Sequence, residues 1–466
     1  MIPGAGKAPA RSGRPAPLPP RPYQFPRFER RRLANGMQLV VAPVRKLPVA
    51  TAIALVDAGA VCGYKGREGI ALLTAQLLLE GTLTYDGVEL VEHFERLGTS
   101  VEASSSWDGT VVTLTALKEQ LGPAIKLLGE VLCEPSFPPR EVERLKGERL
   151  AELLKLRAEP RGLADELFTR ILYDPNSRYA IPEGGSEDSV EAITRGDVQR
   201  FYSWRYRPGS VTLVLAGDIS PDEAERIATQ TFGEWAGAAA GPCSTNDGPA
   251  RTTRALHIVS KPDAKQSELR IGNVGLPRRH PDYYSAVVMN AVLGGLFSSR
   301  INLNLREKHG YTYGAFSHID WRRQAGPFMV STAVQSEVTA PAAREALREI
   351  DRIRSDKISV DELSLATSYL DGVFPIRYET TDAIAGALAT LVQYELPDDF
   401  YDTYREHVRA VTTNDVLRVA QQHLRPEALQ MLAVGNPDSI QAPLEEVGFG
   451  RATVYDTYGE KLDENL

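Results

Sequence analysis

Residues 69–82 read G-I-A-L-L-T-A-Q-L-L-L-E-G-T, an apolar stretch with no charged side chain before Glu80. This pattern predicts a short helix buried in a core, because a membrane span needs about 20 apolar residues in a row. A second apolar helix is predicted at 283–293, in the other half of the chain. Two such helices, one in each half, indicate that the same unit occurs twice.

The segments around the two helices support this duplication. In the first half, the stretches that alternate as strands do are 37–42, 50–55, 100–105, 110–117 and 210–216, and helices are predicted at 120–132 and 140–157. In the second half, the corresponding strands are 255–259, 268–274, 313–320, 327–334 and 428–434, and the helices are 340–353 and 360–370. The pattern predicts an α+β fold of two duplicated domains, each a mostly antiparallel sheet with helices covering one face.

Small residues, glycine and proline mark the boundaries of these domains. Residues 237–250 (G-A-A-A-G-P-C-S-T-N-D-G-P-A) are predicted to be a linker. It separates a first domain at 28–236 from a second at 251–460. Residues 1–27 are proline-rich and contain no apolar signal-peptide core, so they are interpreted as a disordered leader.

Composition excludes several classes of function. The 466 residues are 42% hydrophobic and 24% charged, which suits globular domains with full cores. The net charge of −8 gives no general attraction to nucleic acid or anionic lipid, and no apolar run is long enough to span a membrane. A cytoplasmic location is expected; a periplasmic or secreted location is the alternative if the true start of translation differs.

The cysteines and histidines suggest neither a disulfide framework nor a metal site. Cys62, Cys133 and Cys243 form no close pair, so all three are interpreted as small buried residues in a chain compatible with a reducing compartment. His309 and His318 are nine residues apart, and His93 stands alone. The sequence also lacks G-x-S-x-G, Walker and G-x-G-x-x-G motifs.

The second half carries the motif with the clearest chemistry. Residues 293–300 read L-G-G-L-F-S-S-R, and residues 305–313 read L-R-E-K-H-G-Y-T-Y. With the G-I-A-L-L-T-A-Q segment, they make residues 28–450 resemble the pitrilysin/insulinase family of zinc peptidases. That family also includes mitochondrial processing peptidase and core proteins of respiratory complexes.

The resemblance implies that the zinc site has been lost. In active members the first helix carries H-x-x-E-H, whose three functional positions fall on Leu72, Ala75 and Gln76. A third ligand, a glutamate on a later helix, would fall near Glu152. One glutamate cannot hold zinc, because zinc sites use three or more protein ligands. We therefore expect no metal in this chain.

The resemblance also implies that Arg306 and Tyr313 are kept from the family's active site. A guanidinium and a phenol can donate hydrogen bonds to a peptide carbonyl while it is attacked. A helix-end arginine and a strand tyrosine would be the purely structural interpretation of the same pair. Residues 102–110 resemble the family's edge strand, where a peptide can add as a further strand; here they are expected mainly to close a chamber wall.

A chain without zinc ligands but with this pair resembles one subunit of the two-subunit bacterial members of the family. The resemblance implies half of a clamshell chamber, a partner subunit that bears H-x-x-E-H and holds the zinc, and an unfolded peptide as substrate. Arg306 and Tyr313 would then act in trans. Two other hypotheses remain open: a structural assembly subunit, and a chamber that binds peptides without cutting them.

Overall fold

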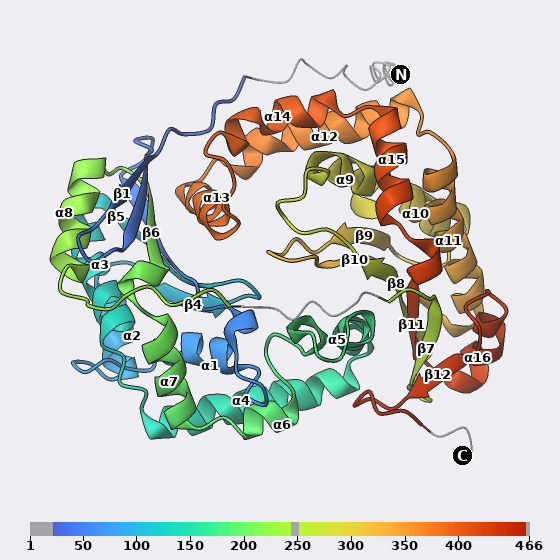
Figure 1. The fold of residues 1–466 in the computed structure, drawn as a ribbon, viewed down its shortest axis with the longest axis horizontal. Coiled ribbons are helices and arrows are strands. Elements are labelled where there is room, and N and C mark those ends of the chain that lie inside the picture. Colours follow the sequence, from blue (N-terminus) through green and yellow to red (C-terminus); the bar gives the residue numbers. More distant parts are fainter. Residues whose placement is uncertain (1–21, 244–250, 463–466) are drawn as a thin grey trace, which may run out of the picture.

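The computed structural model describes residues 22–243 and 251–462. Figure 1 shows two halves facing each other, each built around a six-stranded sheet. Residues 1–21 of the predicted leader and 244–250 of the predicted linker lie outside the described residues. The exact domain boundaries expected from the sequence stay predictions.

The first half contains six strands and eight α-helices in its described residues. Its strands are β1 (Glu29–Arg32), β2 (Gln38–Pro43), β3 (Val49–Val56), β4 (Val101–Ser105), β5 (Thr110–Leu117) and β6 (Val211–Gly217). Its α-helices are α1 (Ile70–Leu77), α2 (Gly87–Arg96), α3 (Lys118–Cys133), α4 (Pro139–Ala158), α5 (Pro160–Leu172), α6 (Glu187–Glu191), α7 (Arg195–Arg205) and α8 (Pro221–Phe232). Short 3-10 turns lie at Ala60–Cys62, Arg178–Ala180 and Pro208–Ser210.

The second half repeats the layout. Its strands are β7 (Ala255–Ser260), β8 (Gln266–Val274), β9 (Ala315–Ile319), β10 (Pro327–Gln335), β11 (Gln430–Gly435) and β12 (Ala452–Tyr455). Its α-helices are α9 (Tyr283–Asn290), α10 (Arg300–Asn302), α11 (Thr339–Ser355), α12 (Val360–Arg377), α13 (Thr381–Gln393), α14 (Phe400–Ala410), α15 (Thr413–His423) and α16 (Pro437–Glu445). Two π-helical segments, η4 (Ala291–Gly295) and η5 (Leu303–Lys308), follow α9 and α10; 3-10 turns lie at Ser336–Val338 and Pro426–Ala428.

The two sheets have the same topology. Their strand orders are β1-β2-β6-β3-β5-β4 and β12-β7-β11-β8-β10-β9, so five strands of each half correspond in chain order. Most neighbours are antiparallel, whereas β2–β6, β7–β11 and β7–β12 are parallel. The sixth strand differs, because β1 begins the first half and β12 ends the second. The predicted duplicated α+β fold is confirmed.

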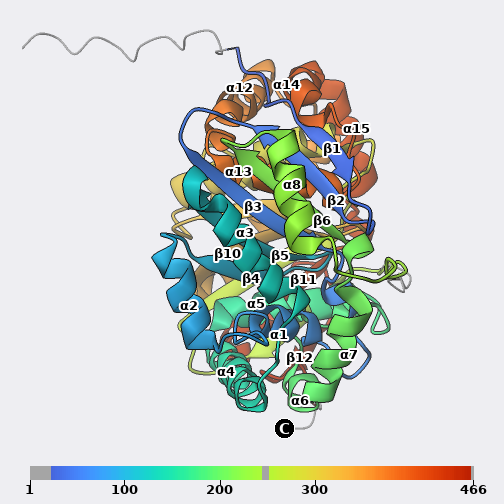
Figure 2. The same ribbon diagram turned by 90° about the vertical axis from the view of Figure 1, so that its left-hand side faces the viewer.

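Helices cover both faces of each sheet, whereas the sequence predicted helices on one face only. Helices α3 and α8 lie across the outer face of the first sheet (Figure 2), and α11 and α16 pack beside the second. On the inner side, α13 of the second half packs on β3 and β6, while α5 of the first half packs on β8 and β11. The halves therefore exchange one helix each, and both inner faces are partly buried.

The side chains of β3 show both layers. Ala52 and Ala54 belong to the same buried cluster as α3, whereas Ile53 and Leu55 belong to the cluster that contains Ile384 of α13. Successive residues of a strand point to opposite faces, so this strand is apolar at nearly every position. The exchanged helices make the two halves one packing unit.

The segment before β1 packs on the second half. Phe25 is 4% exposed, and its ring stacks on Tyr401 with centroids 4.7 Å apart. The Tyr23 hydroxyl donates a hydrogen bond to the Tyr378 carbonyl at 2.9 Å. Residues 22–27, which the sequence placed in the leader, thus connect the two halves at the side opposite α5 (Figure 1).

One helical stretch of the described chain, Tyr283–Lys308, is long and apolar enough to cross a membrane by length and composition alone. Its most apolar window is 61% buried inside the protein, and extended backbone at Leu296 interrupts it. Burial in the second half accounts for its apolar side chains, since core helices have the same composition.

The cysteine interpretation was wrong. Cys62 and Cys243 form a disulfide with Cα atoms 5.1 Å apart, and Cys133 is free. The two residues are 181 positions apart in the sequence, so only the path of the linker over the first half brings them together. Spacing along a chain cannot reveal such a pair.

Candidate functional site

The helix that corresponds to the family's metal-binding helix is α1. It begins after Gly69, whose backbone is left-handed with φ 96°, and a Cβ at this position would lie 2.7 Å from the Gly184 carbonyl oxygen. Only glycine fits this turn without a clash. Leu72 and Gln76 are half-buried, and Ala75 is fully buried. The helix therefore serves to pack the core, since Leu72 and Ala75, two of the three motif positions, have hydrocarbon side chains.

Glu152 lies on α4, which packs against α1. Its carboxylate is exposed and forms an ion pair with Arg149 at 3.0 Å, one turn earlier on the same helix. Leu72 and Ala75 have no ligand atom, and a lone carboxylate already paired with an arginine does not make a zinc site. The residues present do not fit a zinc ion.

One other group of potential ligands occurs among residues 22–243 and 251–462, at the start of α9. His280, Asp282 and His423 place their ligand atoms within 4.8 Å of one another. These atoms already bond one another and Arg418: Nε2 of His423 lies 2.8 Å from Asp282, whose other oxygen accepts from Arg418 at 2.8 Å. Arg418 and His423 together lower the pKa of Asp282 to about 2. The cluster therefore joins α9 to α15 as an ion-pair network.

The zinc content of the protein tests two statements: that the α1 positions bind no zinc, and that the cluster of His280, Asp282 and His423 is an ion-pair network. We expect the isolated chain, dialysed against metal-free buffer, to retain only substoichiometric zinc, because the α1 positions supply no ligand set. Elemental analysis by plasma mass spectrometry measures this directly. Stoichiometric zinc would contradict the expectation, and its loss in His423→Ala but not in Glu152→Gln would place the ion at the α9–α15 cluster.

Arg306 lies on η5, at the end of a helix that enters from α10. Its guanidinium stacks over the Phe297 ring, 4.6 Å from the centroid, and its Nε lies 3.4 Å from a Glu307 oxygen. The side chain is 36% exposed, while Phe297 and Leu303 beside it are 61% and 44% exposed. The arginine is thus held against an aromatic ring at the surface, with its donors accessible.

Buried polar contacts fix the segment that carries Arg306. Arg300, on α10, donates two hydrogen bonds to the Glu362 carboxylate, at 2.6 and 2.9 Å. Glu362 also closes the capping box of α12 with Ser359. Asn302 is fully buried, donates to the Phe297 carbonyl and accepts from the backbone N–H of Ala315. These contacts join η5 to α12 and to β9.

We expect Glu362→Gln to lower the free energy of unfolding at pH 7 by about 1–2 kcal/mol. This is less than the full pKa shift of Glu362 implies, because the side chain is 31% exposed and water screens its interactions. The Arg300 hydrogen bonds lower the pKa of Glu362 from 4.5 to about 2. The carboxylate is therefore stabilising above pH 4.5, and its contribution is lost as the pH falls towards 2. Urea unfolding of both proteins at pH 7 and near pH 3 measures this, and a constant difference across that range would contradict it.

Tyr313 follows a turn that links η5 to β9. Gly310 has φ +66°, and Thr312 accepts from the backbone N–H of Gly314, so the chain reverses before the strand. The Tyr313 side chain is 94% exposed. The strand predicted at 313–320 begins at Ala315, so Tyr313 lies in the turn before β9, and a ring this exposed adds little packing to the fold.

Tyr313 lines a cavity of about 640 Å³ on the inner face of the second sheet. Strands β8, β9 and β10 supply most of the wall, and α5 from the first half supplies Arg161, Asp165 and Thr169. Arg270, 2% exposed, donates to Asp165 at 2.6 Å and to Glu268 at 2.8 Å, which fastens α5 to the sheet. Of the two predicted residues, Tyr313 is in this lining and Arg306 is not.

The strand β9 is the edge of the second sheet, and β4 is the edge of the first. The predicted edge at 102–110 is therefore in place, and the turn after β4 has a structural role. Trp107 contacts the Arg322 guanidinium of the second half, 4.4 Å from the ring centroid, and Asp108 accepts from the backbone N–H of Arg323 at 2.7 Å. These contacts hold the turn after β4 against the second half, and the role of the segment in a chamber wall stays a prediction.

Comparison with known proteins identifies the family. Residues 40–178 match the insulinase family, peptidase family M16, and residues 192–370 match the family described as the peptidase M16 inactive domain. The chain belongs to the M16 peptidase family. The first match runs from β2 to α5 of the first half, and the second runs from α7 of the first half to α12 of the second, so together they take in elements of both halves of this M16 chain.

Some relatives of this M16 chain are named as proteases or peptidase subunits, and one is named as a non-peptidase homolog. An uncharacterized zinc protease of Streptomyces coelicolor is 24% identical over 84% of this chain and 86% of its own length. A Helicobacter pylori protein named non-peptidase homolog YmxG is 24% identical over 80% of this chain and 85% of its own. A probable β subunit of the mitochondrial processing peptidase of Schizosaccharomyces pombe is 27% identical over 58% of this chain.

A solved structure shows the same fold. The crystal structure of a peptidase M16 inactive domain from Pseudomonas fluorescens has a TM-score of 0.83 and 26% identity, covering 88% of this chain and 98% of its own. The names of these relatives range from zinc protease to non-peptidase homolog, and the match at 192–370 is to an inactive domain, so this M16 chain is peptidase-like. Its α1 helix carries Leu72, Ala75 and Gln76 where the resemblance places the zinc motif.

Proposed function

We propose that this M16 chain is the non-zinc subunit of a heteromeric zinc peptidase and supplies Arg306 and Tyr313 to cleavage in its partner. The partner would be a family chain that bears H-x-x-E-H and provides the zinc and its activated water. The substrate would be an unfolded peptide enclosed between the two subunits. The observation that carries the proposal is Tyr313, a 94% exposed phenol on the wall of an inner cavity.

The surroundings of Arg306 support a site completed by another chain. Phe297 and Leu303 expose large apolar surfaces beside the guanidinium. Apolar and aromatic side chains around an arginine are typical of the central part of protein interfaces. Once a partner covers them, water is excluded, and the arginine's hydrogen bonds to a substrate carbonyl become stronger.

The chemistry of the pair suits the stabilisation of a developing oxyanion. Arg306 can donate two hydrogen bonds in a planar fork, and Tyr313 can donate one from its hydroxyl. Both groups favour the tetrahedral, negatively charged carbonyl oxygen over the planar ground state. Neither has to gain or lose a proton for this role.

An assay of the reconstituted pair tests the proposal. The chain is mixed with an H-x-x-E-H family protein from the same genome, and cleavage of a quenched fluorescent, unstructured peptide is followed. We expect a complex on size-exclusion chromatography, activity in the mixture, and little activity from either chain alone. A complex without activity would favour the structural assembly role, and peptide binding without cleavage would favour the binding chamber.

A further inference from the structure

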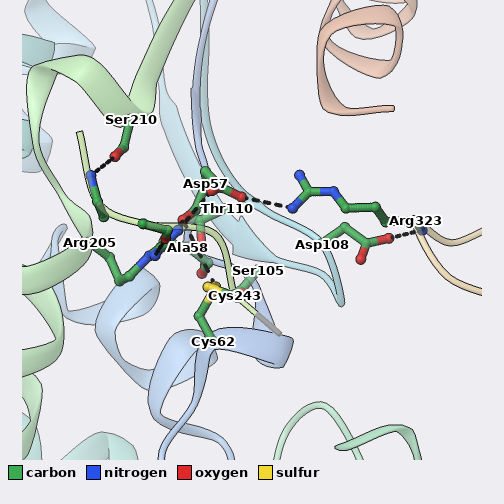
Figure 3. The surroundings of a disulfide bond; sticks show 12 residues. Asp57, Ala58, Cys62, Ser105, Asp108, Thr110, Arg205, Ser210, Cys243 and Arg323 are labelled. Carbon is green, nitrogen blue, oxygen red and sulfur yellow. Dashed lines mark hydrogen bonds and ion pairs between the residues drawn. A yellow bond between two sulfur atoms is a disulfide. The ribbon is translucent and has the colours of Figure 1, made fainter. Parts of the chain in front are cut away.

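The disulfide joins the first half to the segment between the halves. Cys62 ends the 3-10 turn that follows β3 and is 4% exposed, whereas Cys243 lies just before the second half and is partly exposed. Figure 3 shows Arg205 and Asp57 near the bond, with Arg323 reaching Asp57 from the other side. The cystine is therefore close to the point at which the two halves meet.

The chain leading to Cys243 lies tightly against the first half. The backbone N–H of Ala240 donates to the Ser210 hydroxyl at 2.8 Å, and the Gly241 carbonyl accepts from Arg205 at 2.6 Å. A Cβ on Gly209 would lie 2.8 Å from the backbone nitrogen of Ala239. Residues 237–243, which we call the strap, thus cover the end of α7 and the start of β6.

The strap covers an ionic contact between the halves. Arg205 is fully buried, and its guanidinium donates to the Asp57 carboxylate and carbonyl, each at 2.8 Å. The other oxygen of Asp57 accepts from Arg323 of the second half at 3.1 Å. One carboxylate is therefore shared by a buried arginine under the strap and an arginine from the β9–β10 turn (Figure 3).

The same turn is held at further points on the first half. The backbone N–H of Arg323 donates to Asp108, the Arg322 guanidinium stacks against Tyr179, and the Tyr173 hydroxyl donates to the Ala325 carbonyl at 2.8 Å. Residues 321–326, which we call the latch turn, thus contact the first half at Asp57, Asp108, Tyr173 and Tyr179. Arg205 and the strap hold Asp57 in place, and Asp57 is one of the groups of the first half that the latch turn contacts.

We propose that the Cys62–Cys243 disulfide is a redox-dependent tether, which holds the strap on Arg205 and Asp57 and thereby stabilises the latch turn's contact between the two halves. The disulfide also favours an oxidising compartment, periplasmic or extracellular, over the cytoplasm that the sequence suggested, because such bonds persist where thiols are not kept reduced. This inference is independent of the proposed co-catalytic function.

The chemistry requires a thiol–disulfide exchange partner. A disulfide oxidant such as oxidised glutathione accepts two electrons and two protons from the Cys62 and Cys243 thiols and becomes two thiols itself. In the reverse direction a dithiol reductant attacks the sulfur of Cys243, the more exposed of the two residues, which releases Cys62 as the leaving thiolate. A second attack on the mixed disulfide frees Cys243 and leaves the reductant oxidised.

Thiol counting on the full-length protein tests the bond. After equilibration with oxidised glutathione and alkylation in denaturant, we expect one modified cysteine, Cys133, and three after reduction. Peptide mapping should recover the Cys62 and Cys243 peptides linked. Three alkylated cysteines without reduction would overturn the proposal.

Hydrogen exchange tests the tether itself. Compared with the oxidised protein, the reduced protein and Cys62→Ser/Cys243→Ser should exchange the amides of residues 321–326 about tenfold faster, because the latch contact opens more often. Native proteolysis between the halves should accelerate similarly. Cys133→Ser, kept oxidised, is the matched control and should behave as the wild type. If the double variant does not fold, reversible reduction of the wild type gives the same comparison. Equal exchange in the oxidised and reduced states would overturn the tether.

Discussion

Replacing Arg205 by methionine is expected to lower the free energy of unfolding by about 3 kcal/mol, the lower end of the range for breaking a buried ion pair. Arg205 is fully buried, and its guanidinium donates to the carbonyls of Asp57 and Gly241 and to the Asp57 carboxylate. Methionine fills similar space but leaves these acceptors without their donor. The Asp57 side chain is 32% exposed, so water partly compensates, which places the loss at the lower end.

Two further variants make this result specific. Arg205→Lys should recover only part of the loss, because a single ammonium cannot reach acceptors on both sides of a planar fork. Arg207→Ala should change stability by less than about 0.5 kcal/mol, since Arg207 makes an exposed contact with the Ser203 carbonyl. The midpoint of urea unfolding, followed by tryptophan fluorescence, measures all three. Equal stability of Arg205→Met and wild type would show that the buried guanidinium is not needed.

Most strands of this fold could be predicted from the sequence because their signal is local, whereas β1 and β12, the two short edge strands, were not among the predicted ranges. The predicted range 110–117 coincides with β5, and 327–334 differs from β10 by one residue. Alternation of side chains, turn residues and the repeated order are all present within short windows. The duplicated topology followed from applying the same pattern to both halves.

The exchanged helices could not be predicted in the same way. Neither α5 nor α13 was singled out, although together they bury the inner faces of both sheets. A helix that packs on the other half looks like any amphipathic helix, and its partner sheet is hundreds of residues away. The apolar pattern of β3 on both faces was the available signal, since a strand covered on one side only would alternate with polar residues.

The candidate site could be predicted only where its residues lie close together in the sequence. Arg306 and Tyr313 lie seven residues apart within one motif, so the resemblance was enough to select them. Arg161 and Asp165, which line the same cavity as Tyr313, come from α5 of the first half, and no sequence pattern linked them to β9. The disulfide was missed on similar grounds, because its cysteines meet only through the course of the strap.

In the complex with a zinc-bearing partner, Arg306→Ala and Tyr313→Phe are each expected to lower kcat/KM for peptide cleavage by about 10²–10³-fold, as loss of one oxyanion donor does. Both donors bind the transition state more strongly than the substrate, so kcat should fall while KM changes little. Arg306→Lys should lie between, because it keeps the charge and loses the fork.

The same variants separate catalysis from folding. Tyr313 is 94% exposed, so Tyr313→Phe should leave the unfolding midpoint and complex formation unchanged. Lys308→Ala and Tyr311→Phe are matched controls on the same segment: Lys308 is exposed, and Tyr311 stacks on His309 with centroids 5.0 Å apart. Full activity of the doubly substituted Arg306→Ala/Tyr313→Phe complex would contradict the co-catalytic role. A structural subunit needs no exposed phenol at the wall of a cavity. Full activity of the double variant would therefore also leave the exposed position of Tyr313 without a function.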